Sequence, residues 1–194
     1  MNFDLTNLSL TGIVLFIAAY LIGIKFPDWD FKMKLRHRNI LTHSPIILIL
    51  LYILSLKNPS VEFRYFIMGF SLSLGVHLTF DIFPKAWTGG AMIQMPIIRY
   101  SFKKNTSKLI LLVSILLSFG MTIKNTNEVE EVIFMFLFGI CMMLKEMIKE
   151  GKIIRPILVY SVILGTLATM KYDKILSCVS MVYTNVQKTV INLL

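Results

Sequence analysis

The sequence predicts an all-α fold, a polytopic membrane helical bundle of about six transmembrane helices with an amphipathic helix at its C-terminal end. The first observation is composition. Hydrophobic residues make up 56% of the 194 residues and charged residues only 16%, and the mean hydropathy is +0.72, whereas soluble domains average about 25% charged residues. The second observation is that the apolar residues gather into long segments separated by short basic stretches, which is typical of membrane-spanning helices.

Six apolar segments are the predicted membrane helices, because a spanning helix needs roughly 17–25 mostly apolar residues. They are residues 8–26, 44–57, 65–83, 108–123, 131–148 and 154–171. The second segment opens with Ser44 and Pro45, which are typical of a helix start. Its rise is only about 21 Å at 1.5 Å per residue, shorter than the ~30 Å hydrocarbon core. We therefore expect either a thinner membrane there or a preceding loop that dips inward.

The distribution of positive charge predicts the orientation. Fourteen of the twenty Lys and Arg residues lie around the first, third and fifth connections. By the positive-inside rule these connections face the cytoplasm and both termini face outward. The formal net charge of +9 is explained by this topology. We therefore expect the lipid bilayer as the partner and no nucleic acid.

The chain is predicted to form a single membrane-embedded domain over residues 1–194, because no linker or internal repeat divides it. A motif-bearing half (1–107) precedes the apolar helices and the tail (108–194). The N-terminus lacks the basic start and the cleavage pattern of a secretory signal, so the first segment is expected to remain in the mature protein. Cys141 and Cys178 lie far apart, without the spacing of a disulfide framework or a thiolate metal site.

The tail from Tyr172 onward is predicted to be an amphipathic helix. It lies either on the outer membrane surface, which its periodicity favours, or against the bundle. The apolar residues at helical spacing are Ile175, Val179, Val182, Val186 and Val190.

Three short polar stretches fall on the cytoplasmic side in this topology. They are PDWD after the first segment, HRNILTHS before the second, and GVHLTFD near the inner end of the third. In the last of these, His77 and Asp81 are four residues apart and therefore share a helical face. Together the stretches contain six candidate metal ligands and every histidine of the chain: Asp28, Asp30, His37, His43, His77 and Asp81.

A metal site is the interpretation that the three stretches favour jointly. An ionisable group within a membrane helix costs about 2.5–3.5 kcal/mol on insertion scales, so such groups usually face a cavity and have a function. Imidazole nitrogens and carboxylate oxygens suit zinc, manganese or iron. Each stretch alone has a simpler explanation: a solvated turn for Asp28 and Asp30, a basic flank that sets topology for His37 and its neighbours, and a neutralising structural pair for His77 and Asp81.

The three stretches resemble the inner-membrane-associated metal-dependent hydrolases of the YdjM type. That pattern has Pro-Asp-x-Asp, then His-Arg-Gly-x-Thr-His-Ser, then His-x-x-x-Asp followed by a stretch containing Pro and Gly. The resemblance covers about residues 20–100. Family members often carry a further histidine near the N-terminus and another directly after Pro-Asp-x-Asp, where this chain has Phe31. The spacing in HRNILTHS is one residue longer, and Asn39 replaces the glycine. With two ligand positions changed, the resemblance implies a one-metal site or a degenerate site.

The resemblance implies metal-assisted hydrolysis, with zinc as the first choice of divalent ion and manganese or iron as alternatives. It implies His37, His43, His77 and Asp81 as ligands. Asp28 and Asp30 would complete the metal shell, with one of them as general base. Four basic residues on the same side are candidates for binding an anionic, phosphate-bearing group, although each is also explained by topology: Arg36, Arg38, Lys85 and Arg99.

The first functional hypothesis is a hydrolase of the bacterial inner membrane that acts at the cytoplasmic interface on a lipid or other phosphoester. The second is a non-catalytic membrane protein that binds or conducts a metal ion. The third is a structural, partner-binding membrane subunit with a relic site. The last three segments contain no ionisable residue in mid-membrane, so a site on one side is favoured over a path through the membrane.

Overall fold

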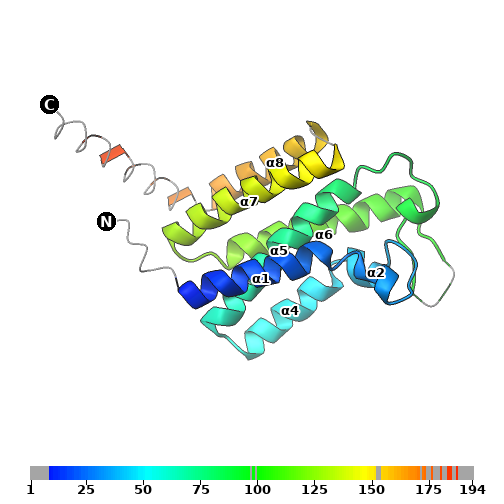
Figure 1. Ribbon diagram of the computed structural model, residues 1–194, viewed down its shortest axis with the longest axis horizontal. Helices are drawn as coiled ribbons and strands as arrows, with labels where there is room; N and C mark the ends of the chain where they lie inside the picture. The colour runs from blue at the N-terminus through cyan, green and yellow to red at the C-terminus, as the bar shows by residue number, and fades with distance from the viewer. Residues whose placement is uncertain are drawn as a thin grey trace.

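The computed structural model is an assembly of helices (Figure 1). It describes residues 9–96, 98, 100–151 and 154–170, and in the tail residues 172, 173, 176, 180, 183, 184 and 187. Within these residues there is no β-strand; isolated bridges join Asn39 to Gln94 and Gln94 to Ser101. The predicted all-α class is therefore confirmed for the described part of the chain.

Each of the six predicted apolar segments corresponds to one long helix. These helices are α1 (Leu10–Lys25), α4 (Ile46–Lys57), α5 (Val61–Asp81), α6 (Lys104–Lys124), α7 (Val129–Glu150) and α8 (Ile154–Met170). Two short helices that the segments did not include, α2 (Trp29–Lys32) and α3 (Ile40–His43), lie between α1 and α4. A 3-10 turn, η2 (Gly89–Ala91), lies in the connection from α5 to α6.

One helix of the described residues, α6, is long and apolar enough to cross a membrane. The helices α1 and α4 are apolar but shorter, with 16 and 12 residues. The start of α4 lies close to its predicted position, since the helix begins at Ile46 directly after Pro45. Of the six long helices in the described structure, one thus has the length and the apolar composition of a membrane-spanning helix.

Helix α5 is the centre of the fold, and it packs most extensively against α1 and α6. Figure 1 shows α7 and α8 along one side of this core and α4 along the other. Close approach between α1 and α5 depends on glycines. A Cβ atom on Gly69 of α5 would overlap the backbone of Phe16 on α1, and one on Gly23 of α1 would lie 2.7 Å from the Phe70 carbonyl oxygen. Glycine lets two helix backbones approach to this distance.

Hydrogen bonds between polar side chains also connect the long helices. Ser71 of α5 and Thr122 of α6 have their hydroxyl oxygens 2.9 Å apart, buried in the helix contact. At the end of the bundle away from α2, Arg64 of α5 donates to Glu131 of α7 at 2.7 Å and to the Asn125 carbonyl at 2.6 Å. Glu131 is 2% exposed and also accepts the Asn127 backbone N–H at the start of α7. This pair therefore fixes α5, the end of α6 and the start of α7 relative to one another.

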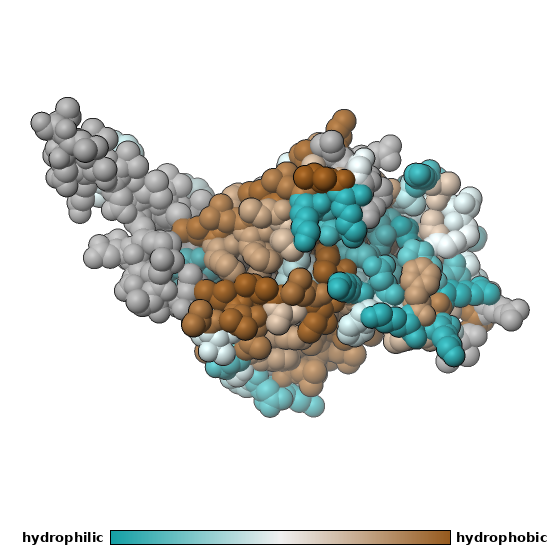
Figure 2. Space-filling view, viewed as in Figure 1, coloured by the Kyte–Doolittle hydropathy of each residue, from teal (hydrophilic) through white to brown (hydrophobic). Residues whose placement is uncertain are grey.

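The surface of the long helices is apolar. Figure 2 shows hydrophobic residues over the body of the bundle and hydrophilic residues gathered at the end that carries α2. Large hydrophobic side chains that are more than half exposed occur on α1, α6, α7 and α8, for example Val14, Leu116, Leu137 and Leu158. A surface of this kind is unusual for a soluble monomer.

Two sequence-based expectations lie outside the described residues. They are the position of Arg99 and the apolar face of the predicted C-terminal amphipathic helix.

Candidate metal site

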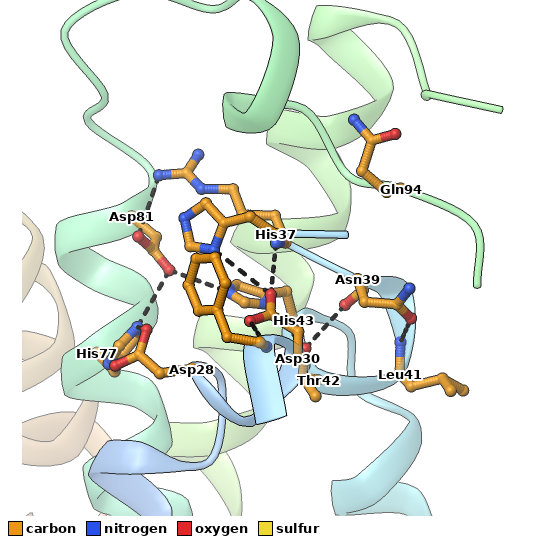
Figure 3. Close-up of polar contacts among 12 residues, drawn as sticks. Asp28, Asp30, His37, Asn39, Leu41, Thr42, His43, His77, Asp81 and Gln94 are labelled. Atoms are coloured by element: carbon orange, nitrogen blue, oxygen red, sulfur yellow. Dashed lines mark hydrogen bonds and ion pairs between the residues drawn. The ribbon is translucent and has the colours of Figure 1, made fainter. Parts of the chain in front are cut away.

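The three polar stretches meet at one end of the bundle, where the end of α1, the short helices α2 and α3, and the last turn of α5 come together (Figure 3). The ring centroids of His37 and His43 are 5.9 Å apart, and those of His43 and His77 are 6.2 Å apart. The histidines of the chain therefore form one cluster, although His43 and His77 are 34 positions apart in the sequence.

The tightest group of potential ligands consists of His43, His77 and Asp81. One ligand atom from each lies within 4.8 Å of the others. Asp81 Oδ2 is 3.2 Å from His43 Nε2 and 3.3 Å from His77 Nε2. Because His77 and Asp81 are one turn apart at the end of α5, the helix presents both to the same side, and α3 brings His43 opposite them.

The outer nitrogen of each imidazole in this group is held by a hydrogen-bonding group of the protein. His77 Nδ1 is 2.9 Å from the Ile24 carbonyl oxygen at the end of α1, so Nδ1 is the donor. His43 Nδ1 is 2.9 Å from the Thr42 hydroxyl, which donates its own proton to the Asn39 carbonyl and can therefore accept one. We assign the tautomers from this network. Both Nε2 atoms then present lone pairs, as in metal-binding histidines.

Two of the three inward-facing atoms complete no hydrogen bond in the described part of the chain. His43 Nε2 and Asp81 Oδ2 are buried and complete no hydrogen bond within the described residues. Burial lowers the pKa of His43 below its usual value, which keeps this ring neutral at neutral pH. Three acceptor atoms thus face a common point, and an arrangement of acceptors without donors is stabilised by a cation.

Arg38 holds the other oxygen of Asp81. Its Nη2 donates to Asp81 Oδ1 at 3.0 Å, and its Nη1 donates to the Ala91 carbonyl in η2 at 2.7 Å. Arg38 is 5% exposed and has a φ of +57°, a conformation that is uncommon for residues other than glycine. Its observed contacts position the site, and a role in substrate binding remains a prediction.

Asp30 lies behind two of the histidines. Its side chain is fully buried, and its carboxylate accepts the backbone N–H groups of Phe31 and Arg38, each at 2.7 Å. One of its oxygens is 3.4 Å from His37 Nδ1 and 4.0 Å from His43 Nδ1. The carboxylate thus faces the Nδ1 side of both rings. This placement suits a group that orients ligands better than one that binds the ion directly.

Asp28 and His37 lie at the rim of the site. The Asp28 carboxylate is 56% exposed and lies 3.9 Å from His77 Nε2, so it combines access to water with proximity to the ligand group. His37 is 37% exposed, and its ring stacks on Phe31 with centroids 4.9 Å apart. Both remain candidate ligands, but neither belongs to the tight group.

The two other basic candidates among the described residues are exposed. Arg36 and Lys85 both lie on the surface in the connections next to the cluster. Lys108 of α6 was not a candidate in the sequence analysis. Its Nζ lies 5.4 Å from the ring centre of Trp87, which belongs to the loop that follows α5.

The loop before α6 packs against the site, and sequence analysis gave no role to three residues that support this region: Asn39, Thr42 and Gln94. Asn39 starts α3 by accepting the Leu41 backbone N–H, and the backbone of Gln94 pairs with Arg38 and Ile40 on either side of it. The Gln94 side chain donates to the carbonyls of Gly89 and Met92. Two features of the sequence could have pointed to these residues. Gln94 is the single polar side chain in the stretch AMIQMPII, and Thr42 directly precedes a candidate ligand.

The chain matched no protein-family model, no curated protein and no solved structure in the three comparisons.

Proposed function

We propose that the chain is an integral membrane protein that binds a divalent metal ion through His43, His77 and Asp81 and acts as a hydrolase at the cytoplasmic membrane interface. One observation carries the proposal: two imidazole Nε2 atoms and a carboxylate oxygen converge within 4.8 Å, and two of these three atoms are buried without a hydrogen-bond partner among the described residues. The motif resemblance to YdjM-type hydrolases points to the same chemistry.

The ligand chemistry supports zinc as the first choice of metal. Two neutral imidazoles and one carboxylate are a common ligand set of catalytic zinc sites, whereas structural zinc sites usually have four protein ligands. The same set also accepts iron or manganese. When bound, such an ion polarises the group to be cleaved and lowers the pKa of water towards ~7.

The surrounding residues support hydrolysis over simple metal storage. Asp28 is exposed and lies 3.9 Å from His77 Nε2, so it is placed to accept the proton of the attacking water. Arg38 fixes the orientation of Asp81, and Asp30 fixes the rings behind it. Exposed Arg36 and Lys85 are our candidates for binding the anionic part of a phosphoester, as is Arg99 from the sequence alone.

The membrane location rests on the apolar surface of the bundle and on the charge distribution. Six long helices run back and forth between the two ends (Figure 1), and α6 passes the test for a membrane span. We propose that the other five long helices also cross the bilayer or line it, with the metal site at the basic, cytoplasmic end. The short α4 would leave the site near the headgroup region.

The test of hydrolysis uses protein purified in detergent, stripped of metal and reloaded with one metal at a time. Substrates are an activated phosphodiester, bis(4-nitrophenyl) phosphate, followed by phospholipids and prenyl phosphates. We expect Asp28→Asn to retain the metal and lose about 10²–10⁴ in turnover. Glu62→Gln, which changes an exposed carboxylate at the other end of α5, is the matched control. A wild-type protein that binds metal but cleaves none of these substrates would favour the non-catalytic, metal-binding alternative.

The orientation is tested by cysteine labelling. In a protein with Cys141 and Cys178 replaced by serine, a cysteine at Lys34 is expected to resist a membrane-impermeant maleimide added to intact cells. A cysteine at Asn127 is expected to react. Labelling of both positions, or of Lys34→Cys alone, contradicts the proposed topology.

A further inference from the structure

Two cavities lie along α4 and α6, the first at the end of the bundle opposite the metal site and the second between the two helices. The first has a volume of about 330 Å³ and a mixed lining at the ends of α4, α5 and α6: the polar residues Ser55, Asn58, Ser60, Arg64, Asn125 and Asn127 and the apolar residues Pro59, Val61 and Phe63. The second has a volume of about 250 Å³ and lies between α4 and α6, where its walls are apolar: Leu48, Ile49, Leu117, Gly120 and Met121.

The residues that line the two cavities are neighbours in sequence near Lys124. Lys124 and Tyr52 line the apolar cavity, while their neighbours Asn125 and Ser55 line the first cavity. Asn125 directly follows Lys124, and Ser55 lies one helical turn beyond Tyr52. The hydroxyl and amide groups at the end of the bundle, which we call the polar compartment, thus lie next along the chain to the apolar groove between α4 and α6.

Lys124 places a positive charge at the wall of the apolar cavity. Its Nζ donates to the Tyr52 hydroxyl at 2.8 Å and lies 4.2 Å from the centre of the Tyr52 ring. No carboxylate of the described residues forms an ion pair with it. The Lys124 ammonium group is therefore held in place by the neutral Tyr52 side chain and has no carboxylate partner among the described residues.

The floor of the groove is open at Gly120. A Cβ atom built at this position has nothing within 4 Å. This glycine therefore differs from Gly23 and Gly69, which make room for a neighbouring helix. The space at Gly120 is available to a ligand.

We infer that the two cavities bind an anionic glycerophospholipid. One acyl chain lies in the groove between α4 and α6, the phosphate faces Lys124, and the headgroup contacts the amide and hydroxyl side chains of the polar compartment. Hydroxyl and amide groups, a cation without an anionic partner among the described residues and an apolar groove suit the headgroup, the phosphate and the acyl chain of such a lipid. The inference shares only the membrane location with the proposed function and does not depend on the metal site.

Lys124 and the metal site lie at opposite ends of α6. Lys124 ends α6, whose 21 residues rise about 32 Å from the end of the bundle that carries the metal site. In the proposed orientation the lipid belongs to the outer leaflet. It is therefore distinct from a substrate bound at the cytoplasmic end.

The groove is tested with Gly120→Leu, whose side chain would occupy the space of the acyl chain. Gly165→Leu is the matched control, because Gly165 of α8 also has nothing within 4 Å of a built Cβ. Delipidated full-length protein in a neutral detergent is titrated with phosphatidylglycerol, and bound lipid is counted by native mass spectrometry. We expect one lipid to remain bound to the wild type and to Gly165→Leu, and none to Gly120→Leu. Equal binding by all three proteins would overturn the inference.

The charge is tested with Lys124→Gln, which is expected to weaken phosphatidylglycerol binding about fivefold. Lys104→Gln, at the other end of the same helix, should bind like the wild type. The wild type should bind phosphatidylcholine more weakly than phosphatidylglycerol. Lys124→Gln should bind the two lipids equally well. A wild type that does not distinguish the two lipids contradicts an anion-selective site. Metal content, measured on the same samples, should not change in any variant.

Discussion

Arg38 and Asp81 form a buried ion pair in which Nη2 of the arginine donates to Oδ1 of the aspartate at 3.0 Å. The other oxygen of Asp81 is thereby turned towards His43 and His77. The same guanidinium binds the Ala91 carbonyl, so one side chain connects a candidate metal ligand with the loop that packs against the site.

Replacing Arg38 with lysine should weaken metal binding by about 10–100-fold. A single ammonium group cannot reproduce the two directed hydrogen bonds to Asp81 and Ala91. Affinity is measured by competition with a chromophoric zinc chelator. Arg36→Lys, two residues away and exposed, provides the matched control and should bind metal like the wild type. Unchanged affinity in Arg38→Lys means that the ion pair does not position the ligand.

Asp30→Asn tests whether the buried carboxylate orients the histidines. Asparagine offers one acceptor oxygen where the two carboxylate oxygens accept the Phe31 and Arg38 N–H groups, so about 1–3 kcal/mol of stability should be lost. Metal affinity should fall as well. Asp28→Asn, at the exposed rim, should melt at the wild-type temperature and bind metal normally. If the two variants behave alike, the different roles assigned to the two aspartates are wrong.

The sequence predicted the long helices and the candidate ligands better than the connections between them. Apolar segments identify helices because their composition differs from that of the loops, and the spacing of His77 and Asp81 places both on one helical face. The meeting of His43 with this pair could be proposed because the predicted topology put both stretches on one side of the membrane.

The details of the 26–43 connection could not be predicted in the same way. The burial of Asp30, the positive φ of Arg38 and the two short helices depend on contacts with α5 and with the loop at Gln94, which are distant in sequence. Asp28 and Asp30 look equivalent in PDWD, but one is 56% exposed and the other fully buried. The pairing of Arg38 with Asp81, 43 residues further along the chain, could not be predicted either, so the sequence indicated only a role in binding an anionic group.

Arg64→Met should destabilise the fold without affecting the metal. It leaves the buried Glu131 carboxylate without its cation, which typically costs about 3–5 kcal/mol, and it frees the Asn125 carbonyl. The melting temperature in detergent should fall, whereas zinc content per folded protein should stay at the wild-type value. Adding Glu131→Met should restore part of the loss, because the uncompensated charge is removed. A double variant less stable than Arg64→Met contradicts this explanation.

Two glycine variants separate close helix packing from simple helix propensity. Gly69→Ala inserts a methyl group into the α1–α5 contact, where the Phe16 backbone already occupies the space, and should lower the melting temperature. Gly120→Ala enters open space and should raise stability by about 0.5–1 kcal/mol, the gain of alanine over glycine in a helix. The opposite order of melting temperatures would contradict the packing of α1 on α5.

The most direct test of the metal site is the metal content of purified wild type, His77→Ala and Asp81→Ala, measured by inductively coupled plasma mass spectrometry. Folding of each variant is checked by circular dichroism. The convergence of His43, His77 and Asp81 predicts one divalent ion per wild-type chain and a loss of that ion in both variants. Equal metal content in the three folded proteins, or none in the wild type after reloading, would contradict the metal site.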